Sequence, residues 1–195
     1  MTSGPRRRAS LAERRERRTA VEDPAVVLEA AARFLEPRAR SVAEVRRRLT
    51  GAGYRADLAE GAIARMLELG MLDDAAFARA WVESRDRARP RGERAIRYEL
   101  GLKGVERAII DAVLADRRSD AAGTDEDGGP GLSPDALAAE RLLARNARAL
   151  GRVPDPRVRR QRAYALLARH GFDPDACSVA LESWARSEDP TGSIE

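Results

Sequence analysis

The sequence predicts an all-α protein in which three tandem three-helix repeats stack into an elongated, curved array. Three observations predict this fold. Helix-start signals recur along the chain, apolar residues follow a helical spacing between these signals, and six apolar positions keep a constant distance from three glycines. No stretch alternates apolar and polar residues over a useful length, so strands are not expected.

Helix boundaries can be placed from capping residues. A side-chain oxygen before a proline is a strong start signal, because the oxygen accepts a hydrogen bond from an unpaired N–H and proline has no N–H to leave unpaired. Such pairs are Asp23-Pro24, Ser133-Pro134, Asp155-Pro156 and Asp173-Pro174. Ser41 with Glu44 is a capping box, and Asp73-Asp74 can begin another helix. Helices are expected to end at Gly51, Gly53, Gly70, Gly104 and Gly171.

The repeat becomes visible when the chain is aligned on Gly53, Gly104 and Gly171. A leucine stands four residues before each glycine, and apolar residues stand eight before it and one, five, nine and ten after it. The residues directly after the glycines are Tyr54, Val105 and Phe172. Each unit is expected to contain a helix, a glycine turn, this apolar residue packed on the next helix, and a second helix, with one more helix before the pair. Units this small are expected to stack on their neighbours.

The predicted organisation has six parts. A basic N-terminal arm over 1–22 is expected to be disordered, or at best a frayed helix, because it has almost no apolar residues to bury. The repeats follow over 23–72, 73–117 and 134–187. An acidic linker rich in Gly and Asp over 118–133 separates the second and third repeats, and a disordered tail covers 188–195.

Composition argues against an enzyme. The chain of 195 residues has one cysteine and one histidine, which excludes a cysteine cage for zinc and makes a histidine-based metal site or catalytic triad improbable. We expect no catalytic residues, no metal, no cofactor and no small-molecule substrate. No apolar run is long enough to cross a bilayer, and the basic N-terminus lacks the apolar core of a secretory signal. A cytoplasmic protein without membrane contact is therefore expected.

Arginine supplies the candidate binding residues. The net charge is +4, residues 1–20 hold seven Arg and two Glu, and residues 21–116 are neutral. The densest basic run in the folded part predicts a partner-binding surface, with Trp81 as an interface anchor; its residues are Arg85, Arg89, Arg91, Arg94 and Arg97, with Arg87 among them. The alternatives are a solvated face with weak surface ion pairs, and a Trp81 buried in the core. Arginines before the other two turns are candidate nucleic-acid contacts: Arg46, Arg47, Arg48, Arg159 and Arg160.

The stretch LGMLDDAAFARAWVESRDRARPRGERAIRYELGLKGV, residues 69–105, resembles the signature of the RecX family of regulatory proteins. The matching residues are Leu72, Asp73, Phe77, Ala78, Trp81, Arg85, Gly92, Ile96, Glu99, Leu100, Lys103 and Gly104. SVAEVRRRLTGAGY in the first repeat and RRQRAYALLARHGF in the third are similar to the family too, so the resemblance covers about 25–186. The linker is longer than the usual connection, and the basic arm is not part of the common core.

The resemblance implies a function. Proteins of this family bind the RecA recombinase filament on single-stranded DNA and lower its ATPase, strand-exchange and coprotease activities, which links them to DNA repair and the SOS response. The implied partners are therefore RecA and single-stranded DNA within the filament complex. The alternative is an autonomous DNA-binding protein, since helix–glycine-turn–helix units with arginine on one helix are similar to helix-turn-helix readers. The neutral charge of residues 21–116 argues against that alternative.

Overall fold

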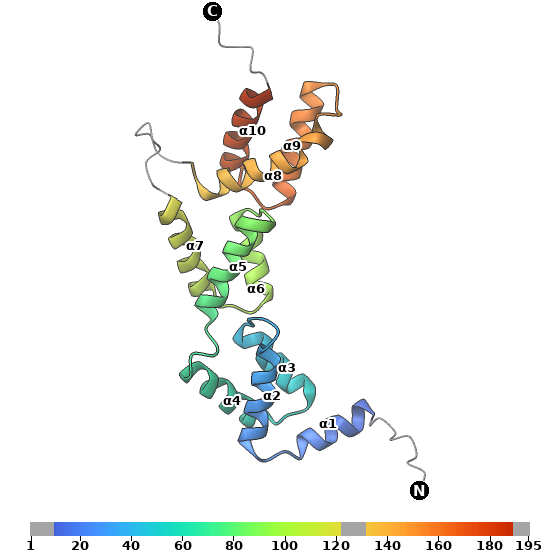
Figure 1. Ribbon diagram of the computed structural model, residues 1–195, viewed down its shortest axis with the longest axis vertical. Helices are drawn as coiled ribbons and strands as arrows, with labels where there is room; N and C mark the ends of the chain where they lie inside the picture. Colours follow the sequence, from blue (N-terminus) through green and yellow to red (C-terminus); the bar gives the residue numbers. More distant parts are fainter. Residues whose placement is uncertain (1–9, 122–131, 189–195) are drawn as a thin grey trace, which may run out of the picture. The chain divides into compact units, whose positions relative to one another are not determined.

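The computed structural model describes residues 10–121 and 132–188, and all regular secondary structure in these ranges is helical (Figure 1). The all-α prediction is confirmed. The helices are α1 (Leu11–Thr19), α2 (Pro24–Leu35), α3 (Val42–Ala52), α4 (Ala56–Glu68), α5 (Asp74–Ala88), α6 (Glu93–Leu102), α7 (Arg107–Ala121), α8 (Pro134–Leu150), α9 (Pro156–Arg169) and α10 (Pro174–Glu188). Parts of the expected arm (1–9), linker (122–131) and tail (189–195) lie outside the described residues.

The three-helix repeats are formed by α2–α4, α5–α7 and α8–α10. Their helices begin where the caps predict. The side chain of Asp23 accepts a hydrogen bond from the Ala25 N–H, Asp73 accepts from Ala76 at 2.8 Å, and Asp173 accepts from Ala176 at 2.7 Å. Ser41 and Glu44 form the expected capping box at the start of α3. Local hydrogen bonding therefore sets the helix starts.

The structure differs from the sequence-based boundaries at three places. Leu11–Thr19 of the arm expected to be disordered form helix α1, because Ser10 and Glu13 make a capping box that satisfies two orphan N–H groups. Helix α3 continues through Gly51 and ends at Gly53. Helix α7 continues to Ala121, into the range expected to be linker.

The three turn glycines have a left-handed backbone conformation, as expected for glycines that end helices. Gly53, Gly104 and Gly171 have φ of 102°, 78° and 84°, a left-handed conformation that L side chains adopt at a cost. The apolar columns on either side are buried. Leu49, Leu100 and Leu167, four residues before the glycines, are 1%, 0% and 0% exposed. Val105 and Phe172 are buried after their turns, whereas Tyr54 is half-buried.

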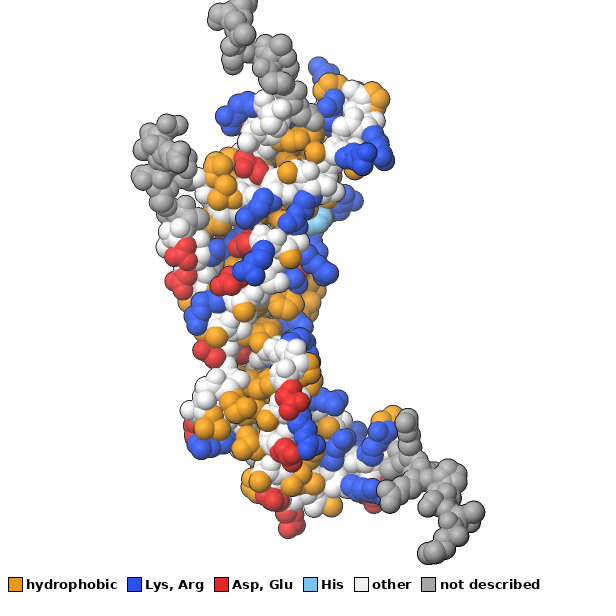
Figure 2. Space-filling view, viewed as in Figure 1, with side chains coloured by type: hydrophobic (Ala, Val, Ile, Leu, Met, Phe, Trp, Pro, Cys, Tyr) orange, Lys and Arg blue, Asp and Glu red, His pale blue; other side chains and the backbone are white. Residues whose placement is uncertain are grey.

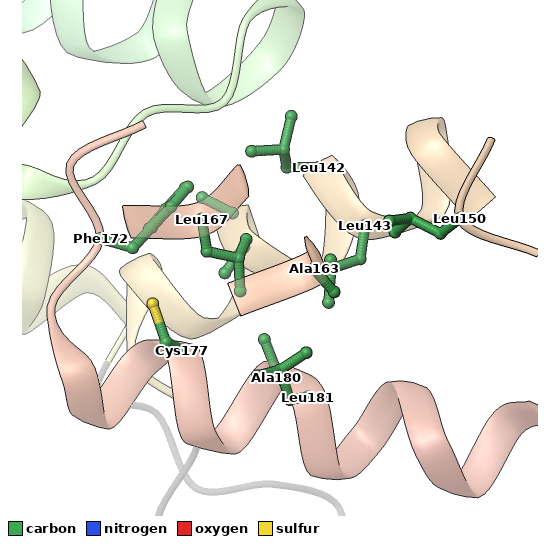
Figure 3. Close-up of a cluster of buried hydrophobic side chains, with 11 residues drawn as sticks. Leu142, Leu143, Leu150, Ala163, Leu167, Phe172, Cys177, Ala180 and Leu181 are labelled. Atoms are coloured by element: carbon green, nitrogen blue, oxygen red, sulfur yellow. The ribbon is translucent and has the colours of Figure 1, made fainter. Parts of the chain in front are cut away.

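Packing divides the chain into two compact units. The first contains Met1–Phe77 and Lys103–Val105, and the second contains Ala78–Leu102 and Glu106–Glu195. The core of the first unit gathers residues of α2, α3 and α4, among them Val27, Val45, Leu49 and Met66. The third repeat has its own core, in which Leu143 of α8, Leu167 of α9 and Cys177 of α10 pack together (Figure 3). The expected stacking into a curved array stays a prediction.

Candidate functional site

Glu99 of α6 gathers three of the predicted partner-binding residues. The indole N–H of Trp81 and the Nε of Arg85 both donate to Glu99 Oε2, at 2.8 and 2.6 Å. Arg91 Nε lies 3.7 Å from the other carboxylate oxygen. The Arg85 guanidinium also stacks on the Trp81 ring, 4.3 Å from its centroid. Trp81 is therefore half-buried and fixed in orientation, which combines features of both expectations for this residue.

Sequence reasoning missed Glu99 as a site residue. It is 18 positions from Trp81 and 14 from Arg85, on another helix, so no helical spacing relates them. Its one sequence signal was its place in the family-like stretch. By fixing Trp81 and Arg85, Glu99 reduces the rotamer entropy that these side chains would lose on binding a partner.

Arg97 belongs to an ion-pair network between α6 and α7. It pairs with Asp111 and with Glu93, at 3.0 Å for the latter, and Arg118 pairs with the other oxygen of Glu93. The Asp111 carboxylate raises the pKa of Arg97, and Arg97 lowers the pKa of Asp111. Figure 2 shows basic and acidic side chains intermixed on the visible face of α5, α6 and α7. Within this run, Arg87, Arg89 and Arg94 are exposed.

The predicted nucleic-acid contacts of the first repeat lie against other parts of their own unit. Arg46 forms a bidentate ion pair with Glu60, in which its Nε and Nη2 donate to the two carboxylate oxygens at 2.6 and 2.8 Å. Arg47 reaches the Lys103 carbonyl at 3.5 Å, and Arg48 lies 5.5 Å from the Phe34 ring centroid. These arginines are more than a third exposed, so each contact contributes about 0–1 kcal/mol and leaves the cation accessible.

The arginines of α9 lie beside a hollow between α9 and α10. Arg160 is exposed and lines this hollow, whereas Arg159 is half-buried. The other lining residues are Arg157, Gln161, Tyr164, Ser178 and Leu181. The structure therefore does not bring the candidate arginines of α3 and α9 into one compact unit, since they belong to the first and second unit respectively.

The second unit contains a buried cation, Arg117. The guanidinium of Arg117, in α7, donates to both oxygens of Asp86, in α5, at 3.0 and 2.7 Å, and to Asp135, in α8, at 2.6 Å. Asp135 also accepts from the backbone N–H of Glu93 at 2.8 Å. The side chain of Arg117 is 7% exposed. Burial raises the pKa of Asp135, so this carboxylate depends on Arg117 for its charge.

Lys103, the one lysine of the chain, belongs to a second cluster, which is centred on Glu44. Its Nζ lies 3.0 Å from Glu44 Oε1, and Arg38 pairs with the same carboxylate at 3.1 Å. Burial opposes ionisation of Glu44. The hydrogen bonds from Arg38, Lys103 and the Ser41 N–H outweigh it and lower the pKa of Glu44 from 4.5 to about 2.

This low pKa predicts an acid-labile first unit. A depressed folded-state pKa stabilises the fold above the unfolded value of 4.5, and this stability is lost as the pH falls toward 2. Glu44→Gln is expected to remove about 2–3 kcal/mol at pH 7, after allowance for solvent screening at the half-exposed Arg38. Denaturant titration between pH 2 and 7 measures the free energy of unfolding at each pH.

The control for this prediction is Glu36→Gln, because Glu36 is an exposed glutamate of the same repeat. The prediction fails if wild type and Glu44→Gln lose stability in parallel between pH 4.5 and 2.

Three comparisons relate the chain to known proteins. Residues 28–66 match the model of the first three-helix domain of RecX, and residues 73–114 match the second. The regulatory protein RecX of Mycobacterium avium (strain 104) is 34% identical over 154 residues, which span 78% of this chain and 82% of that protein. The chain belongs to the RecX family. The RecX of Mycobacterium ulcerans (strain Agy99) is 32% identical, over 80% of this chain and 84% of its own length.

Solved RecX structures share the fold. The crystal structure of RecX from Lactobacillus salivarius superposes with a TM-score of 0.69 over 84% of this chain and 97% of that chain, at 17% identity. A second RecX crystal structure gives a TM-score of 0.67 over 82% of this chain and 73% of that chain, at 19% identity. The second RecX domain match contains Trp81, Glu99 and the arginines around them, whereas α1 and the third repeat lie outside both domain matches.

The described residues contain no group of three or more His, Cys, Asp or Glu side chains placed to hold a metal ion. Nor, over the same ranges, is any helix long and apolar enough to cross a bilayer.

Proposed function

We propose that this RecX family member binds the RecA filament on single-stranded DNA and inhibits its ATPase, strand-exchange and coprotease activities, thereby modulating DNA repair and the SOS response. The observation that carries the proposal is membership in a family of regulatory proteins named RecX. The proposal implies a cytoplasmic protein that is not an enzyme and needs no cofactor.

The geometry around Glu99 supports a role in protein binding. Tryptophan and arginine dominate the binding energy of protein interfaces, and here they form an ordered stack at 4.3 Å. Exposed Arg89 and Arg94 lie on either side of Arg91 in the chain. Guanidinium groups bind carboxylates and phosphates with two parallel hydrogen bonds, so this surface suits an acidic protein face or a DNA backbone. Several linked repeats add avidity to contacts that are individually weak.

The decisive experiment is RecA ATP hydrolysis on single-stranded DNA with increasing amounts of the protein. We expect turnover to fall at substoichiometric ratios, because one molecule that touches a filament affects several protomers. If turnover is unchanged at every ratio, the proposal fails.

Within this function, Arg89→Ala with Arg94→Ala is expected to weaken inhibition about tenfold or more, since two desolvated arginine contacts are lost. Both side chains are exposed, so helicity and thermal melting should not change. ATPase inhibition curves measure the effect. Arg33→Ala with Arg65→Ala is the matched control, because these arginines are also exposed but lie in the first repeat. Equal inhibition by both double variants would show that the partner binds another face.

A second candidate function, autonomous DNA binding, is favoured by one surface of the third repeat. Tyr164 is 43% exposed and lies with Arg157 and Arg160 around the hollow between α9 and α10. An exposed aromatic ring beside two cations can stack on a base while the cations hold phosphates. This function would be supported if the protein binds single-stranded DNA without RecA and the affinity falls steeply with salt. Tyr164→Ala and Arg160→Ala should then both weaken the binding. Binding only in the presence of RecA would exclude it.

A further inference from the structure

Each of the three glycine turns is covered by a helix from elsewhere in its own unit. A Cβ built on Gly104 would collide with the Ala43 side chain, and one on Gly171 would lie 2.5 Å from Ala95 Cβ. A Cβ on Gly53 would lie 2.5 Å from Arg15 Cγ and 2.9 Å from the Arg15 carbonyl oxygen. The missing side chain at each turn therefore lets another helix approach the backbone closely.

The same carbonyl is used at each turn. The carbonyl of the residue before the glycine ends a helix and lacks an intrahelical partner. The Lys103 carbonyl accepts from Ser41 Oγ at 2.6 Å, and the His170 carbonyl accepts from the Gly92 N–H at 3.1 Å. Ser41 and Gly92 both stand twelve residues before the turn glycine of their own repeat, so these two contacts are equivalent.

At the Gly53 turn, α1 supplies the donors. Arg18 donates to the Ala52 carbonyl at 3.4 Å, and Thr19 Oγ1 donates to the Gly53 carbonyl at 3.0 Å. The Arg18 guanidinium also lies 5.8 Å from the Tyr54 ring centroid. Helix α1 docks through the middle and end of the helix, whereas α3 and α6 dock through their first residues.

We infer that the glycine turn is a helix-docking site that this chain uses three times, and that α1 is the capping helix of the first repeat. It occupies on the Gly53 turn the place that the starts of α3 and α6 occupy on the Gly104 and Gly171 turns. Helix α1 has no buried residue, so polar contacts and one arginine–aromatic contact hold it. Unlike α3 and α6, helix α1 therefore contributes no side chain to the core.

The third repeat supports this assignment. In each of the first two repeats, small residues lie against the turn of the following repeat. Ser41 and Ala43 lie against the Gly104 turn, and Gly92 and Ala95 lie against the Gly171 turn. The corresponding positions of the third repeat, twelve, ten and nine before Gly171, hold Arg159, Gln161 and Arg162. The small residues of the first two repeats therefore do not recur at these positions. The series of docking contacts thus begins with α1 on the Gly53 turn, and the start of α9 lacks the small residues that would receive a further turn.

The test compares two full-length variants by hydrogen exchange and by NMR. Arg18→Ala with Thr19→Val removes both donors to the turn, whereas Arg17→Ala removes an exposed arginine of the same helix that is not among these donors. In the double variant we expect the α1 amides to exchange about tenfold faster, because the docking hydrogen bonds are lost. We also expect the NMR chemical shifts of the backbone amides of residues 52–54 to change.

The control variant should leave the exchange of the α1 amides and the shifts at 52–54 close to wild type. Equal exchange rates in the two variants, or shifts in the double variant that are confined to α1, would overturn the inference. Neither readout involves RecA, so failure of this inference and failure of the proposed function are distinguishable.

Discussion

Arg117→Met is expected to destabilise the folded protein by about 3–5 kcal/mol, because it leaves two partly or fully buried carboxylates without their cation. Asp86 and Asp135 both bind Arg117, and their side chains are 26% and 10% exposed. Methionine keeps most of the apolar volume of the arginine stem, so the loss reports on charge. Urea or guanidinium unfolding at pH 7 measures the free energy.

Arg118→Met is the matched control for this prediction. It makes the same substitution one residue later, at a side chain that is 53% exposed and pairs with Glu93, where we expect about 1 kcal/mol or less. Replacing Asp86 and Asp135 by Asn in the Arg117→Met background should recover part of the loss, since the buried negative charge is then gone. If Arg117→Met and Arg118→Met cost the same, the buried cluster does not stabilise the second unit.

Gly92→Ala is expected to cost at least about 3 kcal/mol, although it adds one methyl group. A Cβ at this position would collide with the carbonyl group of Gly171 and the backbone nitrogen of Phe172. These atoms are backbone, so no side chain can rotate away, and the 3.1 Å hydrogen bond from Gly92 to the His170 carbonyl would be lost with the contact. Thermal and denaturant unfolding measure the loss.

Gly101→Ala, in the helix that begins directly after Gly92, is expected to give the opposite result. Gly101 lies in α6 with nothing within 4 Å of its expected Cβ, so alanine should stabilise the helix by about 0.5–1 kcal/mol. The account of the Gly171 turn is wrong if both substitutions shift stability in the same direction.

The helix starts and the repeated core could be predicted from the sequence because both are encoded by local spacing. Ser41 and Glu44 are three residues apart and form the expected capping box. The leucines four residues before each turn glycine are all buried. In contrast, the N-terminal arm was expected to be disordered, or at best a frayed helix, from its lack of apolar residues alone, although Ser10 and Glu13 have the same spacing as Ser41 and Glu44.

The ion-pair clusters could not be predicted in this way. Arg117 is 31 residues from Asp86 and 18 from Asp135, on three different helices, and only the packed fold brings them together. A run of arginines in the sequence likewise does not show which cations meet acids. Arg85 and Arg97 turn out to pair within the second unit, whereas Arg94 is exposed.

The contacts that α8 makes with its neighbours reduce the importance of the covalent connection before it. Asp135, at the start of α8, is bound by Arg117 of α7 and by the Glu93 N–H of α6, and Arg145 donates to the last carbonyls of α5 at 2.6 and 3.0 Å. These contacts position the third repeat on the second. We therefore expect the fold to tolerate insertions and deletions between α7 and α8, because the contacts that join the two repeats are made by residues of the helices themselves.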